Sequence, residues 1–203
     1  FKSIIDSDLI DELEFKYSDL PFYFLKFWFE DIYNKPLDLI AKERIFNKLK
    51  LKKTMFNPYR HLSLSEIVPS EEDDFFRYSK LHGYVHDEGA AMLGGISGHA
   101  GLFSNSYEVA IILQTMIQGG SYDNVKIFEP ESFEIFNTCY YCEFDNRSGV
   151  GFDKPQIEGK HGSTFGGVSK NSFGHYGYTG SMAWADPDEE IIFVFLSNRT
   201  FPT

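Results

Sequence analysis

Two short blocks of polar residues in this chain are spaced so that their side chains could carry out chemistry. The first is Tyr17–Asp19, which lies just before an expected helix. A tyrosine at a helix entrance, with a short polar residue two positions later, can project both side chains into a cleft. Taken alone, the tripeptide is better explained as an ordinary helix cap preceded by a tyrosine.

The second block is the glycine-rich stretch Gly174–Ser181, which contains His175, Tyr176, Gly177, Tyr178 and Thr179. Glycines inside a strand offer nothing to pack, so they favour a place where another group approaches the backbone closely. A strand edge with exposed N–H groups can supply half of an oxyanion hole. The alternative is a glycine-rich hairpin strand with no catalytic role.

A third block, Gly83–Ser104, contains His86, Asp87, Glu88 and His99 among many glycines. It lacks the His-Glu-x-x-His spacing that places metal ligands on one helix face. We therefore expect no metal here: the glycines allow tight packing, and Asp87 caps a turn.

Cys139 and Cys142 have the spacing of half a zinc site, but the chain has no second pair. The interpretation is two unrelated or locally bridged thiols. Neither a metal nor a cofactor is expected.

The elements that must position these blocks begin with helices. The apolar spacing predicts a helix over 19–34, capped by Asp19 with Pro21 in its first turn, and a second over about 37–49. Residues 54–85 show no clean period and indicate a long irregular segment. The clearest helix is predicted over about 106–118, ended by Gly119 and Gly120, and a short one starts at Pro130.

Near the end of the chain the pattern changes to strands. Residues 174–185 and 191–197 are predicted as two antiparallel strands joined by a turn at Asp186–Glu189. The apolar run Ile191–Leu196 is typical of a strand covered on both faces. Helices first and a hairpin last indicate an α+β fold, an antiparallel sheet with a C-terminal hairpin packed against helices, in one domain over residues 1–203.

Composition limits the partners. The chain has 203 residues, of which 42% are hydrophobic, and a formal net charge of -11. An acidic surface repels phosphate backbones, and the lysine-rich run at 48–53 is best explained as the solvated end of a helix. Nucleic acid is therefore not expected as a partner. No apolar segment approaches the ~20 residues of a membrane helix, and Phe1 is not a natural start, so we expect a longer or processed protein.

Three blocks together resemble the class C β-lactamases and their esterase and penicillin-binding-protein relatives. Tyr17–Leu20 is similar to that family's second motif, Tyr-Ser-Asn or Tyr-Ser-Asp. Gly98–Ser104 is similar to its Gly-x-Ala-Gly-Leu-x-Ser segment, and His175–Gly177 stands where the family has Lys-Thr-Gly or His-Thr-Gly. Their order and spacing agree over nearly the whole chain. The subgroup it resembles most is the β-lactamase-like module that follows a β-N-acetylhexosaminidase-like glycoside hydrolase domain in bacterial envelope proteins.

The resemblance implies acyl transfer by a serine in Ser-x-x-Lys, through an acyl-enzyme that water then hydrolyses. It implies that Tyr17 shuttles the serine proton and that Asp19 hydrogen-bonds to the catalytic lysine. It also implies that His175 replaces the third-motif lysine and that the Tyr178 N–H is an oxyanion donor, with Tyr176, Gly177 and Thr179 beside the substrate. Tyr17 and His175–Thr179 must then lie close together. A small-molecule or peptidoglycan-like substrate and a periplasmic or envelope location follow from the same resemblance.

The sequence also departs from the family pattern. No serine in the chain has a lysine three residues later, so Ser-x-x-Lys is absent. Tyr176 stands in place of threonine, Asp19 adds a negative charge, and His175 lacks the permanent charge of lysine. These changes favour an esterase, a peptidase-like enzyme or an inactive protein over a good β-lactamase. The expectation is a serine hydrolase fragment that is inactive alone; the alternative is a non-catalytic binding or interaction module.

Overall fold

A computed structural model describes residues 2–8, 16–144, 146–155 and 167–202. These residues form two compact units. The first contains residues 2–8, 16–105 and 197–202, and the second contains residues 106–144, 146–155 and 167–196. Each unit is described on its own.

The first unit contains the two predicted N-terminal helices, after a short helix α1 (Lys2–Ile5). Helix α2 (Leu20–Tyr33) follows the predicted bounds, with a proline in its first turn and Asn34 in a left-handed conformation after its end. Asp19 occupies the cap position, but its side chain makes no cap hydrogen bond. Ser18 Oγ instead accepts a hydrogen bond from the Leu20 N–H at 3.2 Å.

The second predicted helix is shorter and changes its winding. Helix α3 (Leu37–Ala41) continues as one π-helical turn over Lys42–Phe46 and ends before residue 49. Glu30 ties it to α2, since its carboxylate accepts hydrogen bonds from Lys26 Nζ at 2.6 Å and from the Leu37 N–H at 2.9 Å. The lysines of the 48–53 run are exposed, while Leu49 and Leu51 are buried.

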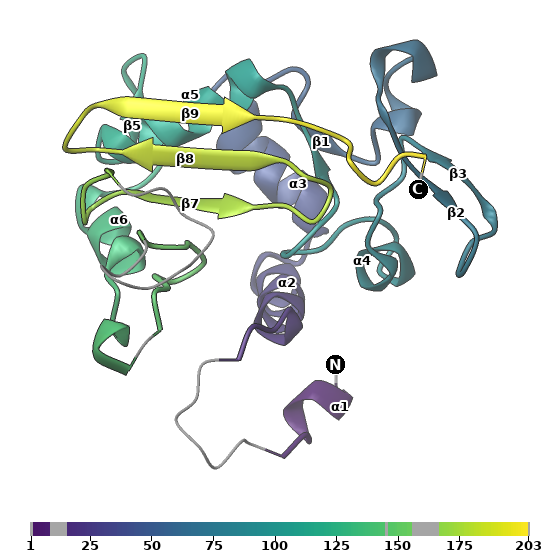
Figure 1. The fold of residues 1–203 in the computed structure, drawn as a ribbon, viewed down its shortest axis with the longest axis horizontal. Helices are drawn as coiled ribbons and strands as arrows, with labels where there is room; N and C mark the ends of the chain where they lie inside the picture. The colour runs from purple at the N-terminus through teal and green to yellow at the C-terminus, as the bar shows by residue number, and fades with distance from the viewer. Residues whose placement is uncertain (1, 9–15, 145, 156–166, 203) are drawn as a thin grey trace. The chain divides into compact units, whose positions relative to one another are not determined.

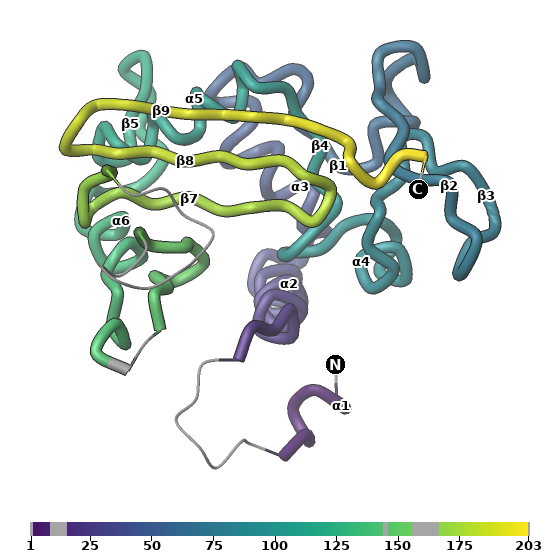
Figure 2. Tube along the Cα trace, viewed as in Figure 1, coloured from purple at the N-terminus to yellow at the C-terminus, as the bar shows by residue number. Residues whose placement is uncertain are grey.

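Residues 54–85 are more regular than predicted. They contain strand β1 (Met55–Phe56), 3₁₀ turns at Pro58–Arg60 and Leu64–Glu66, and an antiparallel hairpin of β2 (Pro69–Asp73) and β3 (Ser79–His82). Figure 2 shows this hairpin near the C-terminus. The prediction of an irregular segment was wrong because these strands are polar, so hydrophobic alternation does not reveal them.

Side-chain hydrogen bonds hold that hairpin together. The Asp73 carboxylate accepts from the N–H groups of Phe75, Phe76 and Arg77 at 2.8–3.0 Å and from Arg77 Nε at 2.7 Å. The chain end returns to the hairpin: Thr200 Oγ1 donates to the Ser70 carbonyl at 2.7 Å, and the Glu72 N–H donates to the Pro202 carbonyl at 3.1 Å. Polar contacts therefore replace an apolar face in this part of the unit.

The glycine-rich block completes the first unit. Helix α4 (Glu88–Met92) begins at Asp87, whose carboxylate accepts from the Ala90 N–H at 2.6 Å, so the predicted capping role is confirmed. Strand β4 (Leu102–Phe103) pairs antiparallel with β1.

In the second unit, helix α5 (Ser106–Ile117) packs against a three-stranded antiparallel sheet (Figure 1). The sheet order is β7 (Phe173–Tyr176), β8 (Met182–Asp186) and β9 (Ile191–Phe195). The predicted β8–β9 hairpin and its turn are confirmed. The single strand predicted over 174–185 is in fact two strands, because the chain reverses at Gly177–Ser181.

The core of this unit lies between the helix and the sheet. Leu113, Phe173 and Ala185 form its buried cluster, and the rings of Phe133 and Phe152 meet Phe173 edge-on at 4.9 and 5.2 Å. Ile191, Phe193 and Phe195 are each about half exposed on the other face of β9. The prediction of a strand covered on both faces was therefore wrong for the described residues.

The remaining elements of the second unit are short. Strands β5 (Ser121–Tyr122) and β6 (Val125–Lys126) pair, and helix α6 (Pro130–Asn137) starts where predicted. A 3₁₀ turn over Cys142–Phe144 follows, and Cys139 and Cys142 form a disulfide, which confirms the locally bridged interpretation. Among the residues that the structure describes, no helix is both long and apolar enough to cross a membrane.

Candidate active site

The first predicted block lies at the entrance to α2. Tyr17 is 69% exposed, and Asp19 is half-buried. The Asp19 carbonyl accepts from the N–H groups of Phe22 and Tyr23 at 3.0 and 3.2 Å, which forms the first turn of the helix. The Asp19 carboxylate accepts no hydrogen bond from the backbone N–H groups at the start of α2.

The second predicted block lies along β7, the outermost strand of its sheet. His175 is exposed, and its Nδ1 is 2.7 Å from the carbonyl oxygen of Tyr176. Because a carbonyl oxygen only accepts, His175 Nδ1 is the donor in this contact.

Tyr178 and Thr179 lie in the turn after β7, not on the strand where the sequence analysis placed them. The Gly180 N–H donates to the Gly177 carbonyl at 2.9 Å, and the Gly177 N–H donates to the Ser181 carbonyl at 2.7 Å. Gly180 has φ +93°, a conformation that favours glycine. The turn therefore presents Tyr178, which is 71% exposed, at the end of the sheet.

Tyr176 is half-buried, and its ring centroid is 6.2 Å from that of Trp184. Burial raises the pKa of the Tyr176 phenol, the charge of Asp153 raises it further, and Arg147 acts in the opposite direction. Tyr176 is consequently a neutral phenol near pH 7, able to donate a hydrogen bond but not to carry charge.

The middle block contains an array that the sequence analysis missed. Ser97 Oγ is 2.9 Å from His99 Nδ1, and His99 Nε2 is 2.8 Å from Asp87 Oδ1. Ser97 is 3% exposed. Although the array joins a serine, a histidine and an aspartate, a buried hydroxyl cannot reach a substrate, so it is not a nucleophilic triad.

Asp19 belongs to the same neighbourhood. Ligand atoms of Asp19, Asp87 and His99 all lie within 4.8 Å of one another, a grouping that could hold a cation. The Asp87–His99 hydrogen bond already satisfies the facing atoms, so the cluster does not require an ion. Partial burial would raise the pKa of Asp87, but hydrogen bonds from the Ala90 N–H and His99 outweigh it and lower that pKa.

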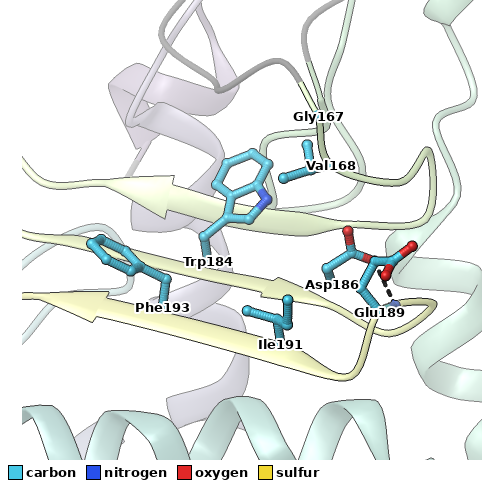
Figure 3. A pocket seen from close by; sticks show the side chains of 7 residues that line it. All are labelled: Gly167, Val168, Trp184, Asp186, Glu189, Ile191 and Phe193. Carbon is cyan, nitrogen blue, oxygen red and sulfur yellow. Dashed lines mark hydrogen bonds between the residues drawn. The ribbon is translucent and has the colours of Figure 1, made fainter.

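The described part of the chain also has a pocket on the sheet face near the β8–β9 turn (Figure 3). Its volume is about 190 Å³, below the ~300 Å³ at which ligand pockets begin. The residues that line it are Gly167, Val168, Trp184, Asp186, Glu189, Ile191 and Phe193. It lies at the opposite end of β8 from the Gly177–Ser181 turn, so it does not contain the predicted site residues.

Each unit therefore assembles one part of the predicted site. The first unit brings Asp19 to the glycine-rich block, and the second unit aligns His175, Tyr176 and the turn that carries Tyr178.

Comparison with known proteins identifies the family. The Beta-lactamase family model matches residues 12–203. The chain belongs to the β-lactamase family. The predicted family and fold class are thereby confirmed.

Several curated relatives match most of this chain. A protein named as a D-alanyl-D-alanine carboxypeptidase in Escherichia coli K12 is 35% identical over 198 residues, covering 90% of this chain and 44% of the relative. One of the same name in Salmonella agona is 34% identical, covering 90% and 45%. The β-lactamase-family chain thus spans less than half the length of these relatives.

Solved structures show the same fold. A β-lactamase from Mycobacterium bovis has a TM-score of 0.60 at 17% identity, covering 91% of this chain and 57% of that one. Simvastatin synthase from Aspergillus terreus has a TM-score of 0.58 at 14% identity, covering 91% and 51%. At these identities the two solved structures show that this chain shares their fold, and no more than the fold.

Proposed function

We propose that this chain is the C-terminal part of a serine hydrolase that cleaves an ester, amide or β-lactam through an acyl-serine, and that it is inactive by itself. The observation that carries the proposal is the placement of His175 and Tyr176 at the end of an outermost strand, with Gly177 beginning the tight turn that follows. An edge strand can hold an extended acyl group by main-chain hydrogen bonds. The backbone of Gly174 already pairs with Asp153, so the stretch proposed to meet the substrate is Tyr176 and the turn after it. Family membership and the names of the relatives support a peptidoglycan-like peptide as the substrate class.

The proposed step is the attack of a serine oxygen on the acyl carbon. Tyr17, as a phenolate, takes the proton of the serine, and the carbonyl oxygen becomes an oxyanion. The bond from the acyl carbon to the leaving amine or alcohol then breaks, and Tyr17 gives that proton to the leaving group. Water attacks the acyl-serine ester, the carboxylic acid is released, and the serine regains its proton. Asp19 would orient the lysine of Ser-x-x-Lys, and the Tyr178 N–H would stabilise the oxyanion.

His175 is proposed to form one wall of the site, with Tyr176, Gly177 and Thr179 beside the substrate. An imidazole lacks the permanent charge of a lysine ammonium and therefore offers less attraction for a ligand carboxylate. We therefore propose an ester or peptide substrate in preference to an efficient β-lactamase reaction.

The nucleophile is proposed to come from chain upstream of Phe1, because no serine of these 203 residues stands in Ser-x-x-Lys. We further propose that a glycoside hydrolase domain precedes that region in the parent protein. The second candidate function is a non-catalytic binding module, which the replacement of the motif lysine by His175 and of the motif threonine by Tyr176 favours.

The test uses the parent protein and an activated ester. We expect a burst of product equal to the enzyme concentration, and Tyr17→Phe should lower the burst rate by about 10²-fold or more, the range for a proton-transfer group. Tyr178→Phe keeps the backbone N–H and is the matched control, with a burst rate near wild type. A parent protein that contains Ser-x-x-Lys but gives no burst would favour the binding module.

The proposal also requires Tyr17 and His175 to act on one acyl group. Cysteines placed at both positions should cross-link with a short bis-maleimide, and the single variants Tyr17→Cys and His175→Cys are the controls that should not. Failure to cross-link at 17 and 175 in the folded parent protein would remove Tyr17 from the proposed mechanism.

A further inference from the structure

The hydrogen-bonded array Asp87–His99–Ser97 fixes the orientation of one imidazole ring. The His99 side chain is 6% exposed. Since the Asp87 carboxylate only accepts, His99 Nε2 donates to it, and Nδ1 is hydrogen-bonded to the Ser97 hydroxyl. Both ring nitrogens are thus engaged, and the ring can neither flip nor shift without breaking two hydrogen bonds.

The fixed ring contacts the first turns of α2. The rings of His99 and Tyr23 meet edge to face, with centroids 4.6 Å apart. A Cβ added at Gly89 of α4 would come within 2.0 Å of the Tyr23 hydroxyl, so Tyr23 sits directly against the backbone of α4. A Cβ at Gly98 would come within 2.8 Å of the Phe22 carbonyl oxygen. The glycine-rich block and α4 therefore hold the start of α2 from two sides.

The same contacts reach the predicted motif itself. The Asp19 carboxylate lies in the group with Asp87 and His99 whose ligand atoms are within 4.8 Å of one another. Burial raises the pKa of Tyr23, and the charges of Asp87 and Asp19 raise it further. Two carboxylates and a neutral phenol thus surround one imidazole, and we expect the loss of its hydrogen bonds to change the surroundings of Asp19.

We infer that His99 is a positioning residue, which, held by Asp87 and Ser97, sets the start of α2 and with it the Tyr17–Asp19 motif. The inference rests on the proposed function for its catalytic meaning. His99 and the residues that it contacts all lie in the first unit. His99 acts through Asp19 and Tyr23 and does not touch the reacting groups.

The deciding experiment is hydrogen exchange on this 203-residue chain with His99→Phe. Phenylalanine keeps the ring contact with Tyr23 but removes both hydrogen bonds, so local opening should rise about tenfold or more. The amides of Phe22 and Tyr23, which bond to the Asp19 carbonyl, report it directly. His99→Gln, which can donate to Asp87 and accept from Ser97, should restore most of the protection.

Controls separate this effect from general unfolding. The Gly120 N–H, bonded to the Thr115 carbonyl in the second unit, should exchange as in the wild type. His61→Phe, at an exposed histidine of the first unit, should leave Phe22 and Tyr23 unchanged. If His99→Phe does not fold, Ser97→Ala removes one bond alone and should give a smaller increase at the same two amides. Unchanged exchange of Phe22 and Tyr23 in a folded variant would overturn the inference.

A kinetic measurement on the parent protein tests the catalytic meaning. His99→Phe should lower kcat for the activated ester by about tenfold with KM within twofold, and His99→Gln should recover it, since a positioning effect acts on the reacting geometry. An active parent whose kcat is unaffected would refute positioning of the site. A wild-type parent with no activity would refute the proposed function instead, while the exchange data would still decide whether His99 holds the motif.

Discussion

Gly174 lies directly across the sheet from Trp184, in register between β7 and β8. A Cβ on Gly174 would come within 2.3 Å of Trp184 Cε3 and of the Ala183 carbonyl oxygen. The group that approaches this glycine is therefore an indole ring of the next strand and not a substrate. The glycine is needed for the packing that supports β7, the strand on which His175 stands.

Gly174→Ala should accordingly destabilise the chain by about 1–3 kcal/mol, the usual cost of overpacking a tight site. Denaturant unfolding of the two proteins measures the difference. Gly177→Ala is the matched control, because the nearest atom to its Cβ would be 3.6 Å away, an ordinary contact. Its stability should stay within about 0.5 kcal/mol of wild type. Equal stability of all three proteins would show that Trp184 moves aside without cost.

The hairpin β2–β3 should lose its order in acid. Hydrogen bonds from the Phe76 N–H and Arg77, among others, hold the pKa of Asp73 well below its usual range. A carboxyl whose pKa is lower when folded adds stability above its unfolded pKa of ~3.9, and this is lost as the pH falls through the folded pKa. Amide protection in residues 75–77 should therefore be constant from neutral pH to about 5 and decline below about 4.

Asp73→Asn should lower that protection at neutral pH and remove its acid dependence. Asp74→Asn changes an exposed neighbour by the same chemistry and should behave as wild type. An acid profile that is the same for the wild type and for Asp73→Asn would show that other groups control the hairpin.

Lys154 should make the stability of the second unit rise with pH. The side chain is buried, with Nζ 2.7 Å from Asn137 Oδ1, and burial lowers its pKa to about 8. Between about pH 8 and about pH 10.5 the unfolded chain holds a proton that the folded chain has lost, so unfolding becomes less favourable as the pH rises. The Tm of the wild-type chain should be higher at pH 9.5 than at pH 7.5. Lys154→Met should lack this rise, and Lys170→Met, which changes an exposed lysine, should retain it.

The exposed face of β9 should make the isolated chain associate with itself. Ile191, Phe193 and Phe195 are 59%, 48% and 55% exposed on one side of this strand. Contiguous apolar surface of this kind favours association. Light scattering should show a mass above 23.4 kDa, and the double variant Ile191→Lys, Phe195→Lys should shift it toward the monomer. A monomeric wild-type chain at high concentration would contradict this.

The sequence alone predicted the elements that have regularly spaced apolar residues and a residue that ends the helix or strand. Helix α2 ends at Tyr33 and is followed by Asn34, and α5 ends at Ile117, shortly before Gly119. Asn34 and Gly119 both have positive φ, and the two glycines predicted the end of α5. The β8–β9 hairpin followed from the turn chemistry of Asp186, whose carboxylate accepts from the N–H groups of Asp188 and Glu189 at 3.1 and 3.3 Å.

Other features depend on partners that lie far apart in sequence or on polar bonds. The β2–β3 hairpin is held by Asp73 and Arg77 and has no apolar alternation. Asp87 and His99 are twelve positions apart, and no spacing rule for helices or strands brings them together. The turn at Gly177–Ser181 lies within a run of strand-forming residues, so β7 and β8 were predicted as one strand.

The most direct test of the central claim is the intact mass of this chain and of its parent after treatment with a fluorophosphonate. A serine hydrolase that loses its nucleophile loses on the order of 10⁶ in rate, as measured for another enzyme. The account predicts no mass shift on the 203-residue chain and a single adduct on the parent, mapped to a serine upstream of Phe1. A stoichiometric adduct on the chain itself, at Ser18, Ser97 or Ser181, would contradict it.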